Sequence, residues 1–113
     1  MCGIVGFVNY KKELPNKKNV INTMTQTLSN RGPDEEGLYL NNNVALGHKR
    51  LIVIDPQGGK QPMIQRFNQG EYVIVYNGQI YNTKELRKTL TENGFTFYGH
   101  CDTEILLKSY IHY

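Results

Sequence analysis

Residues 2–8 read Cys2-Gly3-Ile4-Val5-Gly6-Phe7-Val8. The apolar, β-branched run Ile4–Val8 lies between a glycine and an asparagine, and this pattern predicts a buried β-strand. Cys2, directly before it, has two interpretations. A free cysteine is most often a small buried hydrophobic residue. If Met1 is removed, however, the α-amine of Cys2 lies beside its own thiol, titrates near neutrality and can serve as the base that activates a nucleophile.

The rest of the chain alternates between helix and strand patterns, and we expect an α+β fold. A helix is predicted from an Asn19 cap through Leu28, with Gly32-Pro33-Asp34 as the turn that ends it. Further helices are predicted after a Thr83 cap, ending at Asn93-Gly94, and from Asp102 or Thr103 onward. Short strands are predicted at Gly37–Leu40, Val44–His48, Leu51–Ile54 and Tyr72–Tyr76, with Asn41–Asn43 as a hairpin link.

Length and composition indicate one globular domain in the cytoplasm. The chain has 113 residues, of which 39% are hydrophobic and 20% are charged. No apolar run approaches the ~20 residues that cross a bilayer, and residues 1–6 lack the features of a secretory signal. The sequence therefore predicts no membrane association. A separate expectation concerns the end of the chain: an ending inside an apolar helical segment is typical of a truncated chain.

Cysteines and charge exclude several other classes of protein. Cys2 and Cys101, without a signal peptide, are expected to be free thiols. The formal charge is only +3, and the basic segment Lys11–Lys18 has no interleaved aromatic residues, so a nucleic-acid surface is not predicted. Two cysteines and three histidines at scattered positions lack the spacing of metal ligands, so no metal site is predicted.

Two segments in the first half of the chain can carry chemistry. Turn formation explains most of Asn30-Arg31-Gly32-Pro33-Asp34, but it leaves Arg31 without an explanation. Arg50, at the end of a predicted strand, can bind a carboxylate with its guanidinium, although a surface arginine is the commoner case. Nearby His48 is a candidate partner for the Cys2 thiol, but a lone histidine is more often structural.

Two further segments lie near predicted helix starts. Asn77-Gly78 is typical of a hairpin turn, yet the residues after it lead into a helix rather than a return strand. A side-chain amide next to an exposed backbone N–H suits an oxyanion hole. The segment Cys101–Glu104 is an acidic helix start, which usually complements the helix dipole, but Asp102 can instead bind a substrate ammonium group.

The order of these segments is more specific than any one of them. Together they resemble the class II glutamine amidotransferases, a family of N-terminal nucleophile hydrolases, and in particular the glutaminase domain of glutamine-hydrolysing asparagine synthetases. The resemblance extends over essentially the whole chain. The motifs that carry it are Met1-Cys2-Gly3-Ile4-Val5-Gly6, Arg31-Gly32-Pro33-Asp34, Gly47-His48 with Arg50-Leu51 and Asp55, Asn77-Gly78-Gln79-Ile80-Tyr81-Asn82, and Asp102-Thr103-Glu104.

The resemblance implies a role for each of these positions. Cys2 would attack the side-chain amide of glutamine, with its freed α-amine as general base, and ammonia would leave before water cleaves the thioester. The Asn77 side chain and the Gly78 N–H would form the oxyanion hole. Substrate binding would involve Arg50 at the α-carboxylate, Asp102 at the α-ammonium, the pocket backbone of Leu51, Ile52, Val53 and Ile54, and Gln79, with Arg31 in support.

The resemblance also implies a fold and partners. The expected fold is a four-layer αββα sandwich, with residues 1–113 as the N-terminal part of the amidotransferase domain and an incomplete C-terminus. A synthetase domain of the same chain, which uses ATP and magnesium, would accept the ammonia; no cofactor is expected in this segment. A partial sandwich exposes apolar sheet surface, so self-association into a homo-oligomer is also expected.

Departures from the family pattern leave alternatives open. Gln79 stands where the family commonly has glutamate, which removes a negative charge from the expected pocket. Another acceptor branch, such as the β-lactam-forming synthetases or the phosphoribosyl and hexosamine-phosphate amidotransferases, would share most of these motifs. A binding or assembly module that keeps the fold without turnover is the other alternative.

Overall fold

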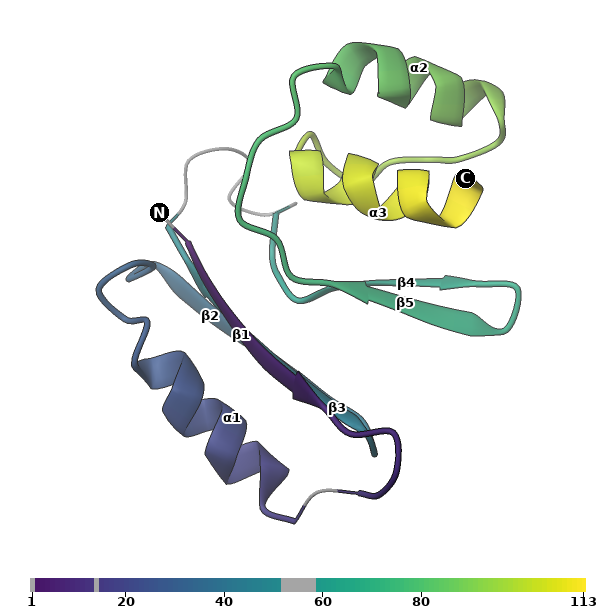
Figure 1. Cartoon of the computed structure of the whole chain (residues 1–113). Helices are drawn as coiled ribbons and strands as arrows, with labels where there is room; N and C mark the ends of the chain where they lie inside the picture. The colour runs from purple at the N-terminus through teal and green to yellow at the C-terminus, as the bar shows by residue number, and fades with distance from the viewer. Residues whose placement is uncertain (1, 14, 52–58) are drawn as a thin grey trace.

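The chain folds into two antiparallel sheets with helices on their outer faces (Figure 1). The structure, a computed structural model, describes residues 2–13, 15–51 and 59–113. Its α+β composition confirms the fold class expected from the sequence. The elements in chain order are β1 (Gly3–Val8), α1 (Lys17–Gln26), β2 (Glu35–Leu40), β3 (Val44–Arg50), β4 (Met63–Phe67), β5 (Gly70–Ile74), α2 (Thr83–Glu92) and α3 (Asp102–His112).

The first sheet has the order β1-β3-β2, and α1 covers one of its faces. Ile21 and Thr25 of α1 are fully buried against it. A Cβ at Gly47 of β3 would lie 2.1 Å from the Thr25 hydroxyl oxygen, so only glycine allows the helix this close to the strand. The Asn41 side chain accepts the backbone N–H groups of Asn43 and Val44, which confirms the predicted hairpin link between β2 and β3.

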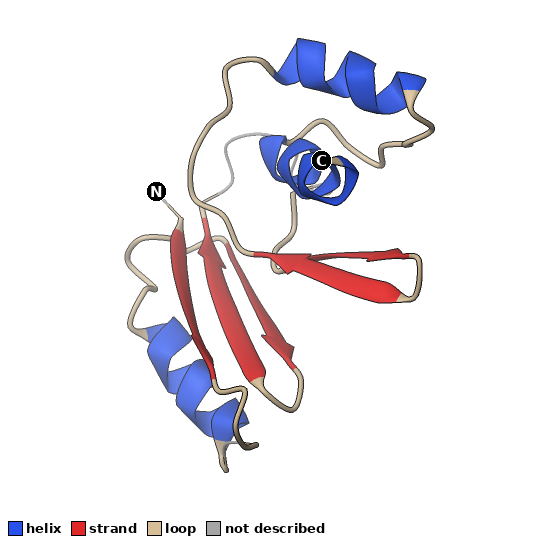
Figure 2. Ribbon diagram, turned by 45° about the vertical axis from the view of Figure 1, so that its right-hand side comes forward, coloured by secondary structure: helices blue, strands red, loops and turns tan. Residues whose placement is uncertain are grey.

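The second sheet is the hairpin β4–β5, whose turn residues Asn68 and Gln69 have positive φ angles of 48° and 66°. Helix α3 packs on this hairpin, and Tyr72 meets Tyr110 edge to face with 6.1 Å between ring centroids. Helix α2 packs in turn on α3 and buries Leu90 completely. Figure 2 shows the hairpin diverging from the first sheet, with α3 between the hairpin and α2.

The two sheets contact each other through β2. The Tyr39 hydroxyl donates a hydrogen bond to the Glu71 carboxylate of β5, and this bond raises the pKa of the phenol. A Cβ at Gly37 would lie 1.9 Å from the carbonyl oxygen of Gln61, just before β4. Glycine at this position therefore lets the backbones of β2 and the Gln61 segment touch, two residues before the second sheet begins at Met63.

Several predicted boundaries need correction. Helix α1 begins at Lys17, not after an Asn19 cap, because Asn16 adopts a left-handed conformation with φ 54° and its carbonyl accepts the N–H of Val20. It also ends at Gln26, so Leu28 lies beyond it and packs against Gly3. Thr83 is the first residue of α2, and Asn82 holds the capping position. The predicted stop at Asn93-Gly94 is confirmed, with Gly94 at φ 92°.

The strand predictions were less complete. Strand β4 was not predicted, and β5 begins and ends two residues before the predicted Tyr72–Tyr76 strand. The prediction of a buried first strand was wrong for one face, since Ile4 and Val8 are 46% and 51% exposed on the side away from α1. Leu51 follows β3 outside any strand, and Ile52, Val53, Ile54 and Asp55 lie outside the described residues.

Candidate active site

Seven of the predicted site residues line one cavity of about 480 Å³, a size suited to a small-molecule ligand. It lies where the ends of β1 and β3, the segment after β5 and the first turn of α3 come together. Arg31 does not line the cavity but contacts Cys2, which does, and Ile52–Ile54 are outside the described part of the chain. The lining residues are Cys2, Arg50, Leu51, Gly59, Gln61, Tyr76, Asn77, Gly78, Gln79, Cys101, Asp102 and Thr103.

The Cys2 thiol, directly before β1, is held by backbone groups of Leu51, directly after β3. Its sulfur lies 3.6 Å from the carbonyl oxygen of Leu51, to which the thiol donates, and 3.3 Å from the Leu51 N–H nitrogen. The Arg31 Nε donates to the Cys2 carbonyl oxygen over 3.4 Å. Cys2 is thus half-buried and contacted from two sides, and its contact with Arg31 is one that turn formation alone does not explain.

The turn that carries Arg31 is fitted to the end of β3. A Cβ at Gly32 would lie 2.3 Å from the carbonyl group of Lys49. The Asp34 N–H donates to the Arg50 carbonyl oxygen over 2.9 Å, and Pro33 bridges to the same strand residue. The Gly-Pro-Asp sequence therefore brings a turn into backbone contact with β3, next to Arg50.

Arg50 is only 4% exposed, and its charge is balanced by a residue that the sequence analysis did not identify. The Glu35 carboxylate accepts a hydrogen bond of 2.9 Å from the Arg50 guanidinium. The two residues are direct cross-strand partners of β2 and β3. Sequence alone does not give the register between two strands, so nothing in it distinguished Glu35 from the neighbouring Glu36.

His48 is fully buried on the same face of β3 as Arg50. Burial lowers the pKa of its imidazole, the Tyr76 backbone partly opposes this effect, and the Arg50 charge lowers the pKa further. Within the described residues, neither ring nitrogen has a well-aligned hydrogen-bond partner. A hydrogen-bonded pair of His48 with the Cys2 thiol is therefore not formed, and the structural interpretation of His48 fits better.

The loop that follows β5 forms another part of the cavity wall. Asn77, Gly78 and Gln79 line the cavity there, and Asn77 and Gly78 are the pair for which an oxyanion hole is predicted. The Ile80 N–H donates to the Asp102 carboxylate over 2.8 Å, which ties this loop to the first residue of α3. Asp102 thus has a structural contact and a place in the cavity, and its charge complements the positive end of the helix.

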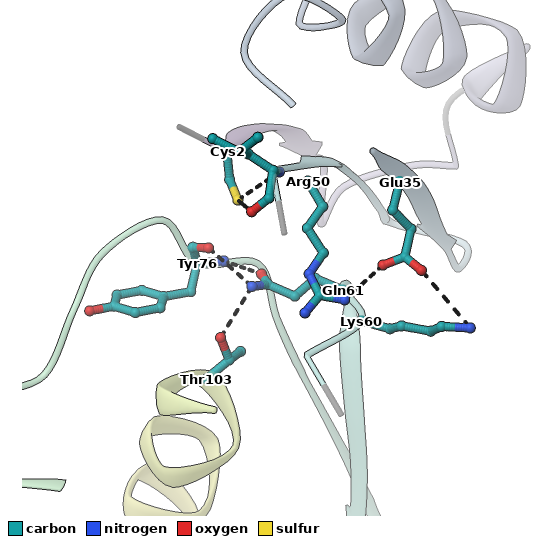
Figure 3. Close-up of polar contacts among 8 residues, drawn as sticks. Cys2, Glu35, Arg50, Lys60, Gln61, Tyr76 and Thr103 are labelled. Atoms are coloured by element: carbon teal, nitrogen blue, oxygen red, sulfur yellow. Dashed lines mark hydrogen bonds and ion pairs between the residues drawn. The ribbon is translucent and has the colours of Figure 1, made fainter. Parts of the chain in front are cut away.

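Figure 3 shows three lining residues that the sequence analysis did not single out for a role: Gln61, Tyr76 and Thr103. The Gln61 side chain accepts the Tyr76 N–H over 2.6 Å and donates over 3.1 Å to both the Tyr76 carbonyl and the Thr103 hydroxyl. In the sequence Gln61 is one polar residue in a Gly-Gly-Lys-Gln-Pro loop. No local pattern distinguishes it from a solvated side chain.

Other features of the described residues do not compete with this cavity. A second cavity, of about 400 Å³, lies between β4 and the end of α3, and none of the predicted site residues lines it. No group of three His, Cys, Asp or Glu side chains in the described ranges is arranged to hold a metal ion.

Each described helix is too short or too polar to cross a membrane.

Comparisons with known proteins agree on one family. Residues 1–113 match the family described as glutamine amidotransferase domain. The chain is 49% identical over 111 residues to the glutamine-hydrolyzing asparagine synthetase 3 of Bacillus subtilis, covering 98% of this chain and 18% of that protein. It is 39% identical over 115 residues to asparagine synthetase 1 of the same bacterium, covering all of this chain and 18% of that protein. The glutamine-hydrolyzing asparagine synthetase 1 of Arabidopsis thaliana is 39% identical over 103 residues, which cover 90% of this chain and 17% of the plant protein. The chain therefore spans about a fifth of the length of these curated relatives.

Proposed function

Because this chain belongs to the family of glutamine amidotransferase domains, we propose that it hydrolyses the side-chain amide of glutamine and releases ammonia. The observation that carries this proposal is the shared cavity. A thiol, a guanidinium, a carboxylate and an Asn-Gly pair all line it, although they come from four distant parts of the sequence. Each of these groups has a counterpart in a glutamine molecule.

Substrate binding would use the two charged ends of the amino acid. Arg50, oriented by Glu35, would bind the α-carboxylate, and Asp102 would bind the α-ammonium group. The backbone from Leu51 to Ile54 and the Gln79 side chain would complete the pocket. Holding both ends of a zwitterion aligns its amide with the thiol and removes much of the entropic barrier to attack.

The chemistry would begin at Cys2 after Met1 is removed. The freed α-amine takes the thiol proton as the sulfur attacks the amide carbon, and it delivers that proton to the departing ammonia. The Asn77 side chain and the Gly78 N–H stabilise the oxyanion of the tetrahedral intermediate. Water then attacks the γ-glutamyl thioester, so that glutamate leaves and the Cys2 thiol is restored.

The whole protein would use the ammonia elsewhere. We propose that residues 1–113 are the N-terminal part of the amidotransferase domain in a four-layer αββα fold, with a synthetase domain of the same chain as the ammonia acceptor. This proposal is supported by the relatives, which are named asparagine synthetases. The other acceptor branches and the inactive module are less favoured for the same reason. No cofactor would serve glutamine hydrolysis, whereas ATP and magnesium would serve the synthetase reaction.

The reaction would take place in the cytoplasm, where a catalytic thiol stays reduced. In the structure Cys2 and Cys101 are both thiols rather than halves of a disulfide.

The test is glutamine hydrolysis by the full-length protein and its Cys2→Ala variant, with Cys101→Ala as the matched control. Both cysteines line the cavity, but only Cys2 is assigned a covalent role. We expect Cys2→Ala to lower ammonia release by about 10³-fold or more and Cys101→Ala to retain it. Ammonia release that survives Cys2→Ala would refute the mechanism.

A further inference from the structure

Gln61 occupies the junction of the two sheets, next to the cavity. Its backbone lies against Gly37 of β2, and its side chain extends toward the segment that follows β5. Pairing in the β4–β5 hairpin ends at Met63 opposite Ile74. In the same register, Pro62 lies opposite Val75 and Gln61 lies opposite Tyr76. Proline has no N–H group, so a backbone ladder cannot continue normally through this point.

The Gln61 side chain replaces the missing ladder with its own amide. Its oxygen accepts the Tyr76 N–H over 2.6 Å, and its nitrogen donates to the Tyr76 carbonyl over 3.1 Å (Figure 3). Tyr76 is thereby bonded on both its polar backbone groups, as a strand residue would be. It is also the residue directly before Asn77 and Gly78.

The same amide extends this bonding to helix α3. Its nitrogen also donates over 3.1 Å to the hydroxyl of Thr103, the second residue of α3. Thr103 is only 5% exposed and follows Asp102 directly. Gln61 therefore links the start of the Asn77-Gly78 loop to the helix end that carries Asp102. Both N–H groups and the oxygen of its amide are used in these bonds, so it has no N–H left for a substrate.

We propose that Gln61 is a positioning residue for the oxyanion hole, acting on Asn77 and Gly78 through the Tyr76 backbone. The inference rests on the proposed glutamine hydrolysis. Oxyanion donors are effective only when they are aimed at the charge before it develops, and a shift of about 1 Å at such a site can cost about 100-fold in rate. The two bonds from the Gln61 side chain hold the Tyr76 backbone in place, which the interrupted ladder of backbone hydrogen bonds does not do.

The principal variant is Gln61→Met in the full-length protein, with Gln65→Met as the matched control. Gln65 lies on the same hairpin, and its side chain bonds only to the neighbouring Arg66 carbonyl among the contacts described. We expect Gln61→Met to lower kcat for glutamine about 100-fold with KM changed less than about threefold, and Gln65→Met to leave both unchanged. A folded Gln61→Met variant with wild-type kcat would overturn the proposal.

A second measurement separates positioning from a general loss of the pocket. An aldehyde analogue of glutamine, in which a CHO group replaces the amide, forms a tetrahedral adduct with a thiol and so reports on the oxyanion hole. Glutamate reports on the ground-state pocket. We expect Gln61→Met to weaken inhibition by the aldehyde about as much as it lowers kcat, while glutamate affinity stays constant. Equal weakening of both ligands would overturn the positioning role.

Thr103→Val keeps the proposal testable if Gln61→Met does not fold. This nearly isosteric change removes one of the three bonds, so we expect kcat to fall several-fold, with recovery in Thr103→Ser. Wild-type kcat in Thr103→Val would count against the link to α3, and together with an unfolded Gln61→Met it would overturn the proposal.

The failure of this proposal can be distinguished from the failure of the proposed function. If the wild-type protein releases no ammonia, the proposed function itself fails. If the wild-type protein releases ammonia through Cys2 and these variants have the same activity, only the role of Gln61 fails.

Discussion

At the scale of single residues, the proposed binding of the α-carboxylate depends on the pair formed by Glu35 and Arg50. The carboxylate fixes a nearly buried guanidinium with a charge-assisted bond. We expect Glu35→Gln to raise KM for glutamine about tenfold, which corresponds to the loss of one hydrogen bond to a charged group, with a smaller change in kcat. Steady-state kinetics of ammonia release by the full-length protein measure both parameters.

The adjacent Glu36 provides the control. Its carboxylate pairs with Lys49 at 2.8 Å and accepts from Gln26 at 2.6 Å on the helix-covered side of the sheet, and these bonds lower its pKa. Glu36→Gln should leave KM unchanged. If the two variants behaved alike, the orientation of Arg50 by Glu35 would not matter for binding.

The buried imidazole of His48 should make stability depend on pH. Its folded pKa lies below the ordinary value of 6.5, so at mildly acidic pH the unfolded chain binds more protons than the folded one. Above about pH 6.5 the ring is neutral in both states, and His48 contributes its full stabilisation of the folded state. This contribution is lost as the pH falls from the pKa of the unfolded chain to the lower pKa of the folded one. Urea unfolding between pH 5 and 8 should show this decline, and His48→Gln should reduce the slope. An unchanged slope in the variant would assign the decline to other groups.

A site residue can be predicted from the sequence when the residues next to it in the chain mark its position. Cys2, Arg50, Asn77 and Asp102 each stand beside a turn or an element end, and the structure brings all four to the cavity. Gln61 and Glu35 could not be found in this way. Their importance depends on which residue lies opposite them in a neighbouring strand, and that register is set by long-range packing.

At the scale of secondary structure, Gly37 is the point where β2 and the start of β4 touch. A methyl group there would lie 1.9 Å from the Gln61 carbonyl oxygen, which belongs to rigid backbone. We expect Gly37→Ala to lower the free energy of unfolding by about 2 to 3 kcal/mol, because overpacking forces the two segments apart. Thermal or urea unfolding measures the change.

Gly6→Ala is a matched glycine control in the same sheet. Its added methyl would approach the end of the Leu46 side chain at 2.7 Å, and a side chain can move more easily than a backbone carbonyl. A loss of stability in Gly37→Ala no greater than in Gly6→Ala would show that the two backbones are not tightly fitted.

The element boundaries that sequence could predict are those with local chemistry. Asn93-Gly94 ended a helix as expected because glycine alone readily adopts the positive φ found there. Strand β4 lacked such a signal. Polar Gln65 and Arg66 interrupt its apolar residues, and pairing with β5 and packing on α3 hold it in place. Those contacts are distant in sequence, so tertiary structure overrides weak local preference.

At the scale of the whole molecule, the inner faces of the two sheets expose apolar side chains. Ile4 is 46% exposed and points away from α1, because its neighbour Val5 lies on the α1 side, next to Gly47 and Thr25. Ile64 is 49% exposed and points away from α3. Side chains alternate along a strand, and the adjacent Gln65 lies on the α3 side of β4. We expect the 113-residue chain by itself to associate through these faces at high concentration.

Light scattering of this chain and its variants tests the association. The double variant Ile4→Thr with Ile64→Thr should shift the population toward monomer. Val20→Thr, on α1 and 45% exposed, should have no such effect. A monomeric wild-type chain at high concentration would contradict the prediction.

The cavity walls are also separated in the time of their synthesis. A ribosome adds Asp102 a hundred residues after Cys2. At the roughly 5 to 20 residues per second of translation, this delay is roughly 5 to 20 s. During that interval the thiol exists, but the helix that closes its pocket does not. Under the proposed function, nascent chains should therefore consume no glutamine, and hydrolysis can start only on a chain that has been made at least as far as α3.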